Sequence, residues 1–226
     1  KQAIEIAEEQ AISTILEKNR YELTKKRFYY DLAVLGTAAV KTVYTNAEGI
    51  KVEYVDPSSV VHSYTESPYF DDIYYIGEIK TIPITELKKE FPNLTNEELD
   101  KLSSKGYSNY RVYNKYNPSS TKQDVNTVDV LYFNFKTYHN EVYKIKETAS
   151  GAKKAIKKDG NFNPPKDQRA RFEREATNIE VLYEGAYIPG ANVLLKWELC
   201  ENMLRPKSDA NKVRMNYSVV APRMYN

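Results

Sequence analysis

The sequence contains very few of the residues that build metal centres or nucleophilic active sites. Among its 226 residues there is one cysteine, Cys200, and there are two histidines, His62 and His139. One cysteine cannot form an intrachain disulfide, and a zinc site or a Ser-His-Asp triad needs more partners than these. The 8 glycines never cluster into a phosphate-binding loop. We therefore expect a protein that is not an enzyme, with no catalytic residues, no cofactor and no metal.

Long apolar segments are missing as well. No run approaches the roughly 20 apolar residues that span a bilayer, and no secretory signal pattern is present, so no membrane partner is expected. Cys200 then fits an intracellular protein as an ordinary small hydrophobic residue. The helical pattern is already under way at Lys1, from which we expect a piece of a longer polypeptide.

What the chain has in abundance is tyrosine, with 20 residues, and its hydrophobic content is 41%. Tyrosine combines an apolar ring with a polar hydroxyl, so it suits half-buried sheet faces and subunit contacts. Charge is unevenly distributed: residues 1–100 hold 11 Lys/Arg and 18 Asp/Glu, a net −7, whereas the remaining 126 hold 22 and 13, a net +9. This polarity predicts two differently charged regions.

The periodicity of apolar residues predicts an α+β fold that begins with one long amphipathic helix over residues 1–35. Its stripe at three-to-four spacing includes Ile4, Ile12 and Asn19, and no Pro or Gly interrupts it before Gly36. At about 1.5 Å per residue the helix would be roughly 50 Å long. Other elements or other subunits would have to cover its apolar stripe.

After Gly36 the pattern changes to antiparallel β-hairpins and short helices, followed by a small α/β region. The first predicted elements are a hairpin of strands near 38–45 and 50–55, a turn at Asp56-Pro57 and a strand over 72–82. Two short helices follow, one over 85–91 capped by Thr85 and one opened by the capping box Thr95–Glu98, and then an exposed loop over 103–127.

The second half of the chain is predicted to begin with two strands within 128–147 around Tyr138-His139-Asn140. After them come a Gly, Pro and Lys-rich segment over 150–168, a helix near 168–177, and three β-like segments at 179–190, 193–199 and 213–225.

Basic residues are concentrated between Lys144 and Arg174, where ten Lys/Arg face four acids, a net +6 over 31 residues. Such a segment attracts polyanions, although a solvated, flexible segment would have the same composition. The C-terminal part adds further cations. The candidate contacts with DNA or a protein partner are Lys153, Lys154, Lys157, Lys158, Lys166, Arg169, Arg171, Arg205, Lys207, Arg214 and Arg223.

Paired acids at Asp71-Asp72 are the other conspicuous polar feature. With Glu66 or Glu78 they would supply oxygen ligands for a divalent ion, whereas adjacent acids in a polar loop are more often simply solvated. Asp56 is explained by its turn. The metal interpretation therefore stays secondary.

The order of several motifs resembles the portal proteins of tailed double-stranded-DNA bacteriophages. A long helix leads into "GTAAVKTVY", then "GIKVEYVDPSSV", then "DDIYYIGEIKTIPITELKKEFP". The later stretches "VYKIKETASGAKKAIKKDGNFNPP" and "VLYEGAYIPGANVLLKWELCENMLRPKSDANKVRMNYSVVAPRMY" look most like the portals of crAss-like phages. The resemblance covers most of residues 20–226, and its specificity lies in the order of the motifs.

The resemblance implies a dodecameric ring of identical subunits at one capsid vertex, with a central channel for DNA packaging and ejection. By order, residues 1–127 would form the wing, 128–178 a β-hairpin and basic connection toward the stem, and 179–226 a clip-like region. The acids and tyrosines of 52–92 would then serve shape and subunit contact. The second stem helix, channel loop and crown would follow Asn226.

The implied partners are identical subunits, the terminase large subunit, the tail adaptor, the major capsid protein and double-stranded DNA bound without sequence preference. The implied location is the virion, with the host cytoplasm during assembly. No catalytic residue carries over, because the family has its ATPase in the terminase.

Two other function classes remain open from the residues alone. A tyrosine-rich β binding module for a glycan or host protein predicts a monomer with an exposed aromatic row over a groove. A metal-dependent nuclease predicts that Asp71, Asp72 and nearby acids converge on one point.

Overall fold

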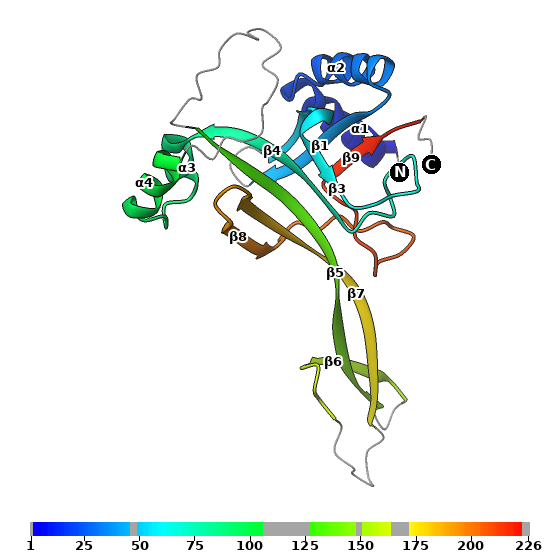
Figure 1. The fold of residues 1–226 in the computed structure, drawn as a ribbon. Coiled ribbons are helices and arrows are strands. Elements are labelled where there is room, and N and C mark those ends of the chain that lie inside the picture. Colours follow the sequence, from blue (N-terminus) through cyan, green and yellow to red (C-terminus); the bar gives the residue numbers. More distant parts are fainter. Residues whose placement is uncertain (1, 46–48, 106–126, 148–150, 164–171, 223–226) are drawn as a thin grey trace.

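The computed structural model of the chain (Figure 1) describes residues 2–45, 49–105, 127–147, 151–163 and 172–222. Its elements in chain order are α1 (Gln2–Lys18), α2 (Tyr21–Val34), β1 (Ala38–Thr45), β2 (Gly49–Val55), a 3-10 turn (Pro57–Ser59), β3 (Val60–His62), β4 (Tyr75–Pro83), α3 (Ile84–Glu90), α4 (Asn96–Lys105), β5 (Thr127–Glu147), β6 (Lys153–Lys158), β7 (Phe172–Ile188), β8 (Val193–Leu199) and β9 (Tyr217–Val220). All strand pairs are antiparallel, which confirms the predicted mixed α+β fold.

The smaller sheet has the order β2-β1-β9. Thr45 pairs with Gly49 and Ala39 with Val55, so the predicted hairpin is confirmed. β9 joins β1 from the other end of the chain, with Lys41 opposite Tyr217. This closure between distant segments has no local signal in the sequence.

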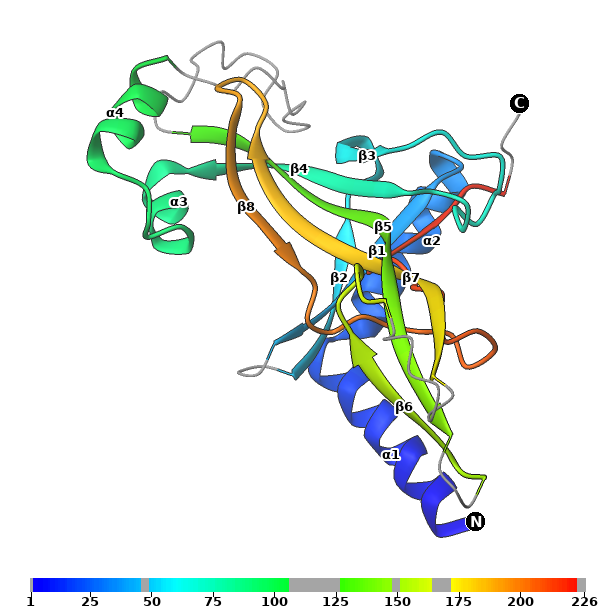
Figure 2. The same cartoon turned by 90° about the horizontal axis from the view of Figure 1, so that it is seen from below.

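The larger sheet has the order β3-β4-β5-β7-β8, and β6 pairs with the distal part of β5. β5 and β7 stay paired without a break from Leu131↔Tyr187 to Lys146↔Phe172. Their distal parts extend away from the body together with β6 (Figures 1 and 2). We call this extension, residues 139–147, 153–158 and 172–179, the β arm.

Helices α3 and α4 bury their apolar faces against one face of the larger sheet. Leu87, Leu99 and Leu102 pack with Val128 and Val130 in one cluster of buried side chains. At about 25 cal/mol per Å² of apolar area removed from water, such clusters are the main stabilising contribution to the fold. The capping box that opens α4 is confirmed, because the Thr95 amide donates to Glu98 (3.0 Å) and the Glu98 amide to Thr95 Oγ1 (3.3 Å).

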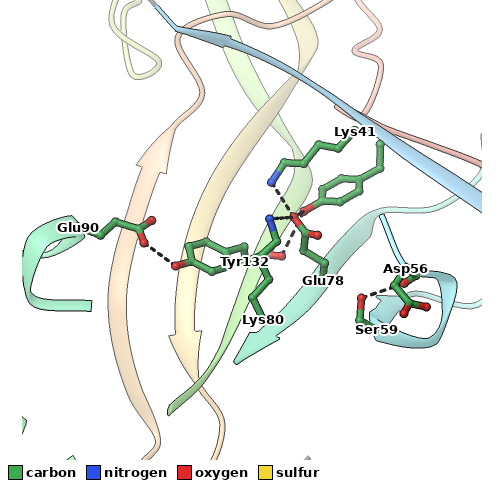
Figure 3. Close-up of polar contacts among 8 residues, drawn as sticks. Lys41, Asp56, Ser59, Glu78, Lys80, Glu90 and Tyr132 are labelled. Atoms are coloured by element: carbon green, nitrogen blue, oxygen red, sulfur yellow. Dashed lines mark hydrogen bonds and ion pairs between the residues drawn. The ribbon is translucent and has the colours of Figure 1, made fainter. Parts of the chain in front are cut away.

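A polar junction connects the two sheets (Figure 3). Glu78 on β4 is 3% exposed. Its Oε1 lies 3.2 Å from Lys41 Nζ on β1 and 3.1 Å from Lys80 Nζ. The Tyr217 hydroxyl on β9 donates to the same oxygen at 3.4 Å. One buried carboxylate therefore contacts both sheets, beside the apolar cluster that includes Ala39, Ile76 and Val219.

The predicted single helix over 1–35 is wrong, because it is two helices broken at Asn19-Arg20. Arg20 has φ 48° and ψ 43°, a left-handed conformation that costs a non-glycine residue roughly 1 kcal/mol or more. The Asn19 side chain compensates: it donates to the Ile50 carbonyl (2.9 Å) and accepts from the Val52 amide (3.2 Å) on the edge of β2. Pairing of this edge outweighs continuation of the helix.

The helix end at Gly36 is confirmed, since α2 ends at Val34 and Gly36 has φ +75°. The turn at Asp56-Pro57 is confirmed as well. Asp56 Oδ1 accepts from the Ser58 amide at 2.9 Å, and the Ser59 hydroxyl donates to the Asp56 carbonyl at 2.8 Å (Figure 3). Thr85 is not the cap of its helix, because α3 begins one residue earlier and its N-cap is Pro83.

Three further predictions need correction, and one strand was missed. Tyr138-His139-Asn140 continues β5 as one strand of 21 residues, because these residues pair with Asn178, Ile179 and Glu180 of β7. Within the segment 150–168, residues 153–158 form β6 through pairing with β5. The helix near 168–177 is strand β7 from Phe172 onward. The strand β3 was not predicted.

The C-terminal region is strand and turn rather than α/β in the part that the structure describes, up to residue 222. The boundary at 178/179 falls inside β7, and β9 belongs to the sheet that β1 and β2 form. Most of the loop predicted over 103–127 lies outside the described residues, and its first three residues end α4.

Candidate functional site

The four lysines Lys153, Lys154, Lys157 and Lys158 lie together on β6, an exposed strand at the edge of the β arm. Successive side chains of a strand point to opposite faces, so the four divide into two pairs. Lys157 contacts Glu141, which also accepts from the Tyr143 hydroxyl. Lys158 instead lies over the ring of Phe162, 5.8 Å from its centroid, on the other face. The structure brings these lysines onto one strand and separates them by face.

The Glu141 contact has an electrostatic signature. The ammonium of Lys157 and the hydroxyl of Tyr143 hold the pKa of Glu141 below its ordinary value. The same contact raises the pKa of Lys157. Both groups are therefore charged over the whole neutral range, and Lys157 already has an anionic partner within the chain.

Arg205 has a structural role at the base of the arm. Its guanidinium donates to the carbonyls of Glu180 (2.9 Å) and Ala210 (3.0 Å), so it fastens the turn after β8 onto β7. Lys207 and Arg214 are exposed in the same turn region, where the Arg214 amide donates to the Leu204 carbonyl. These cations belong to a different element from the β6 lysines. Lys166, Arg169, Arg171 and Arg223 lie outside the described residues.

An aromatic face covers the side of the larger sheet opposite α3 and α4. Its members are apolar residues on five neighbouring strands that enclose a shallow groove of about 340 Å³. They are Val61, Tyr75, Gly77, Leu131, Phe133, Phe135, Tyr187, Leu194 and Trp197. Trp197 is 45% exposed and Leu194 56%. An exposed apolar patch of this kind is typical of a contact surface rather than of a sheet face that only meets solvent.

A glycine outside the lining makes room for Phe133, one of the residues that line this groove. A Cβ on Gly185 would lie 2.5 Å from Phe133 Cζ and 3.0 Å from the Lys196 carbonyl oxygen, so the Phe133 ring occupies space that only glycine leaves empty. The Trp197 ring stacks on Tyr183 at 5.2 Å and contacts Phe133 at 5.8 Å. The rings are thus fixed in place by one another.

No residue of the aromatic face was predicted from the sequence as part of a site. An exposed aromatic row was expected only under the alternative function of a tyrosine-rich β binding module. The alternation Leu131, Phe133, Phe135 was the available signal, because every second residue of a strand shares a face. The pairing of β7 and β8 that adds Tyr187 and Trp197 could not be read from local sequence.

The paired acids do not converge on one point. Asp72 accepts hydrogen bonds from Thr65 Oγ1 and from the Glu66 amide (2.8 Å). Both hydrogen bonds lower the pKa of Asp72, and the one from Thr65 has the larger effect. Glu78 is instead held by Lys41 and Lys80 at the sheet junction. Among the residues that the structure describes, no three His, Cys, Asp or Glu side chains lie close enough to hold a metal ion.

The remaining reactive residues have local partners. His62 Nδ1 lies 2.7 Å from the Ser63 carbonyl and its ring meets Phe70 edge-on. His139 Nε2 lies 3.0 Å from the Tyr183 hydroxyl. Cys200 is buried beside Leu182 and Val213, and burial raises the pKa of its thiol, as expected for a packing residue.

No family model matches the chain, and no curated protein matches it significantly in sequence. None of the helices in the described ranges is long and apolar enough to span a bilayer.

Proposed function

We propose that this chain is a structural subunit of a portal ring of a tailed double-stranded-DNA bacteriophage, most like those of crAss-like phages. In this proposal the subunits surround a channel for DNA packaging and ejection at one capsid vertex. The terminase large subunit and later the tail adaptor dock on the ring, and the major capsid protein surrounds it. The protein acts in the virion and, during assembly, in the host cytoplasm, and it catalyses no reaction.

The observation that carries the proposal is the uncovered apolar surface of α1. This helix of 17 residues buries none of them, yet on the side that carries Ile4 and Ile12 these two isoleucines are 66% and 59% exposed. A helix that buries no side chain in its own chain gains little from packing there, and isolated helices of this length are marginal in water. Contact with neighbouring subunits would supply the missing burial, as ring assembly requires.

The test is the mass and the negative-stain image of the full-length protein. We expect a closed ring with a central hole. A persistent monomer in infected cells and in mature particles would overturn the proposal.

Variants of α1 make the test specific. Replacing Ile4 and Ile12 with Asp places two charges on the apolar surface, so we expect loss of the ring while the melting temperature of the subunit stays within a few degrees. The matched control is Gln2→Asp with Gln10→Asp, which has the same spacing about 200° around the helix. Rings that form equally well from both double variants would show that α1 is not a subunit contact.

The aromatic face favours a second candidate, a tyrosine-rich β binding module for a glycan or host protein. Stacked, exposed rings over a shallow groove suit an apolar or sugar ligand. A stable monomer whose Trp197 fluorescence changes on glycan addition would favour this candidate over the ring.

A further inference from the structure

The β arm separates its charges by face. Strand pairing places Lys144 between Ile156 and Arg174, and places Lys146 beside Lys154. Cross-strand partners share a face of the sheet. One face of the arm therefore holds five cations and no acidic residue among its described positions 142–146, 154–158 and 174–176. We call it the basic face: Lys144, Lys146, Lys154, Lys158 and Arg174.

The opposite face has the reverse balance. It holds four glutamates and two lysines, and Lys157 is already paired with Glu141. Its charged residues are Glu141, Glu147, Glu173, Glu175, Lys153 and Lys157. An arm that needed charge only for solubility, or lysines only to protect its edge strand, would gain the same from cations on either face. The separation of cations and acids onto opposite faces therefore indicates that the cationic face binds an anionic ligand.

The basic face also carries an aromatic ring. The Nζ atoms of Lys144 and Lys158 each lie 5.8 Å from the centroid of Phe162, and Arg174 donates to the Gly160 carbonyl at 3.1 Å. Residues 160–162 therefore lie against this face and contact three of its five cations. An acidic residue, Asp159, lies in the turn that leaves β6, where its carbonyl accepts from the Phe162 amide.

We propose that the basic face of the β arm binds the phosphate backbone of double-stranded DNA without sequence preference. At about 3.3 Å per residue, Lys154 and Lys158 are roughly 13 Å apart along β6, a length over which one DNA strand presents about four phosphates. Lysines are compact point charges that contact phosphates without reading bases. The face is thus suited to loose, sliding contact.

The inference rests on the proposed portal function for the choice of duplex DNA, but its test does not need a ring. If the protein forms a ring but its DNA binding does not depend on the arm, only this inference is wrong. If the arm binds DNA but the protein never forms rings, only the portal proposal is wrong. An acidic protein surface, such as the opposite face of a second copy, is the competing occupant.

The experiment measures binding of the 226-residue chain to a labelled mixed-sequence DNA duplex of about 30 base pairs by fluorescence anisotropy, between about 50 and 200 mM salt. Five phosphate contacts predict a slope of log affinity against log salt near −4.5, about a 500-fold loss over that range. Lys154→Gln with Lys158→Gln reduces the slope to about −2.7 and weakens binding roughly 50-fold at about 100 mM salt.

The matched control is Lys153→Gln with Lys157→Gln, which removes the same charge from the same strand on the opposite face. We expect its slope and affinity to stay close to those of the wild type, and circular dichroism checks that both variants fold. Equal losses in the two variants would show that net charge alone matters and would overturn the proposal. The proposal would also be overturned if the wild-type chain showed no binding to DNA. The same holds if a mass measurement showed that the basic face produces only salt-sensitive self-association.

Discussion

The carboxylate of Glu78 offers the sharpest test of how the two sheets are held together. It is buried, and Lys41, Lys80 and Tyr217 all point to its Oε1. The side chain of Lys41 is 17% exposed, whereas that of Lys80 is 46% exposed. Removing the anion therefore leaves one ammonium poorly hydrated and the other largely free to turn to water.

The magnitude follows from this difference in exposure. Breaking a fully buried pair costs about 3–5 kcal/mol, and an exposed pair contributes about 0–1 kcal/mol. For Glu78→Gln, which keeps the shape and one acceptor, we expect a loss of about 2–3 kcal/mol in the free energy of unfolding. Lys41→Gln should cost about 1–2 kcal/mol and Lys80→Gln less than about 1 kcal/mol.

Urea unfolding followed by the fluorescence of Trp197, the single tryptophan, measures these differences. With a denaturant slope of about 2 kcal/mol per M, Glu78→Gln should lower the midpoint by about 1 M. Circular dichroism should give the same midpoint if both sheets unfold together. Equal costs for the two lysines, or a Glu78→Gln shift below about 0.2 M, would refute the idea that this junction joins the sheets.

Two further perturbations test the junction and the aromatic face. Burial first, and then the charge of Glu78, raise the pKa of Tyr217 above its ordinary value near 10. The unfolded state loses this proton first, so Tyr217 contributes about 1.4 kcal/mol per pH unit to the fall in stability above about pH 10. Tyr54 and Tyr132, whose pKa values burial also raises, add to the same fall. Alkaline urea titrations should therefore give a slope that is shallower by about 1.4 kcal/mol per pH unit in Tyr217→Phe than in the wild type, and an unchanged slope would contradict the assignment. Gly185→Ala should cost about 1–3 kcal/mol and shift Trp197 emission because its Cβ displaces the Phe133 ring. Gly160→Ala, where a Cβ meets nothing within 4 Å, is the control, and equal effects would contradict the packing argument.

Local chemistry in the sequence determined the features that depend on neighbouring residues. The hairpin of β1 and β2, the turn at Asp56 and the capping box at Thr95 were all predicted because each is specified by a turn or cap of a few neighbouring residues. The helix end at Gly36 was predicted for the same reason. The concentration of lysines within 153–158 was also evident from the sequence, but the sequence did not show which lysines share a face.

Only the tertiary structure decided the features that depend on pairing across the chain. Asn19 breaks a regular helical pattern because its amide finds two backbone partners on β2, a contact that no periodicity contains. The segment at 153–158 is a strand because β5 lies beside it, and the pairing register alone separates Lys154 and Lys158 from Lys153 and Lys157. The physical reason is that one strand cannot satisfy its own backbone, so its existence, its register and its faces are properties of the partner it meets.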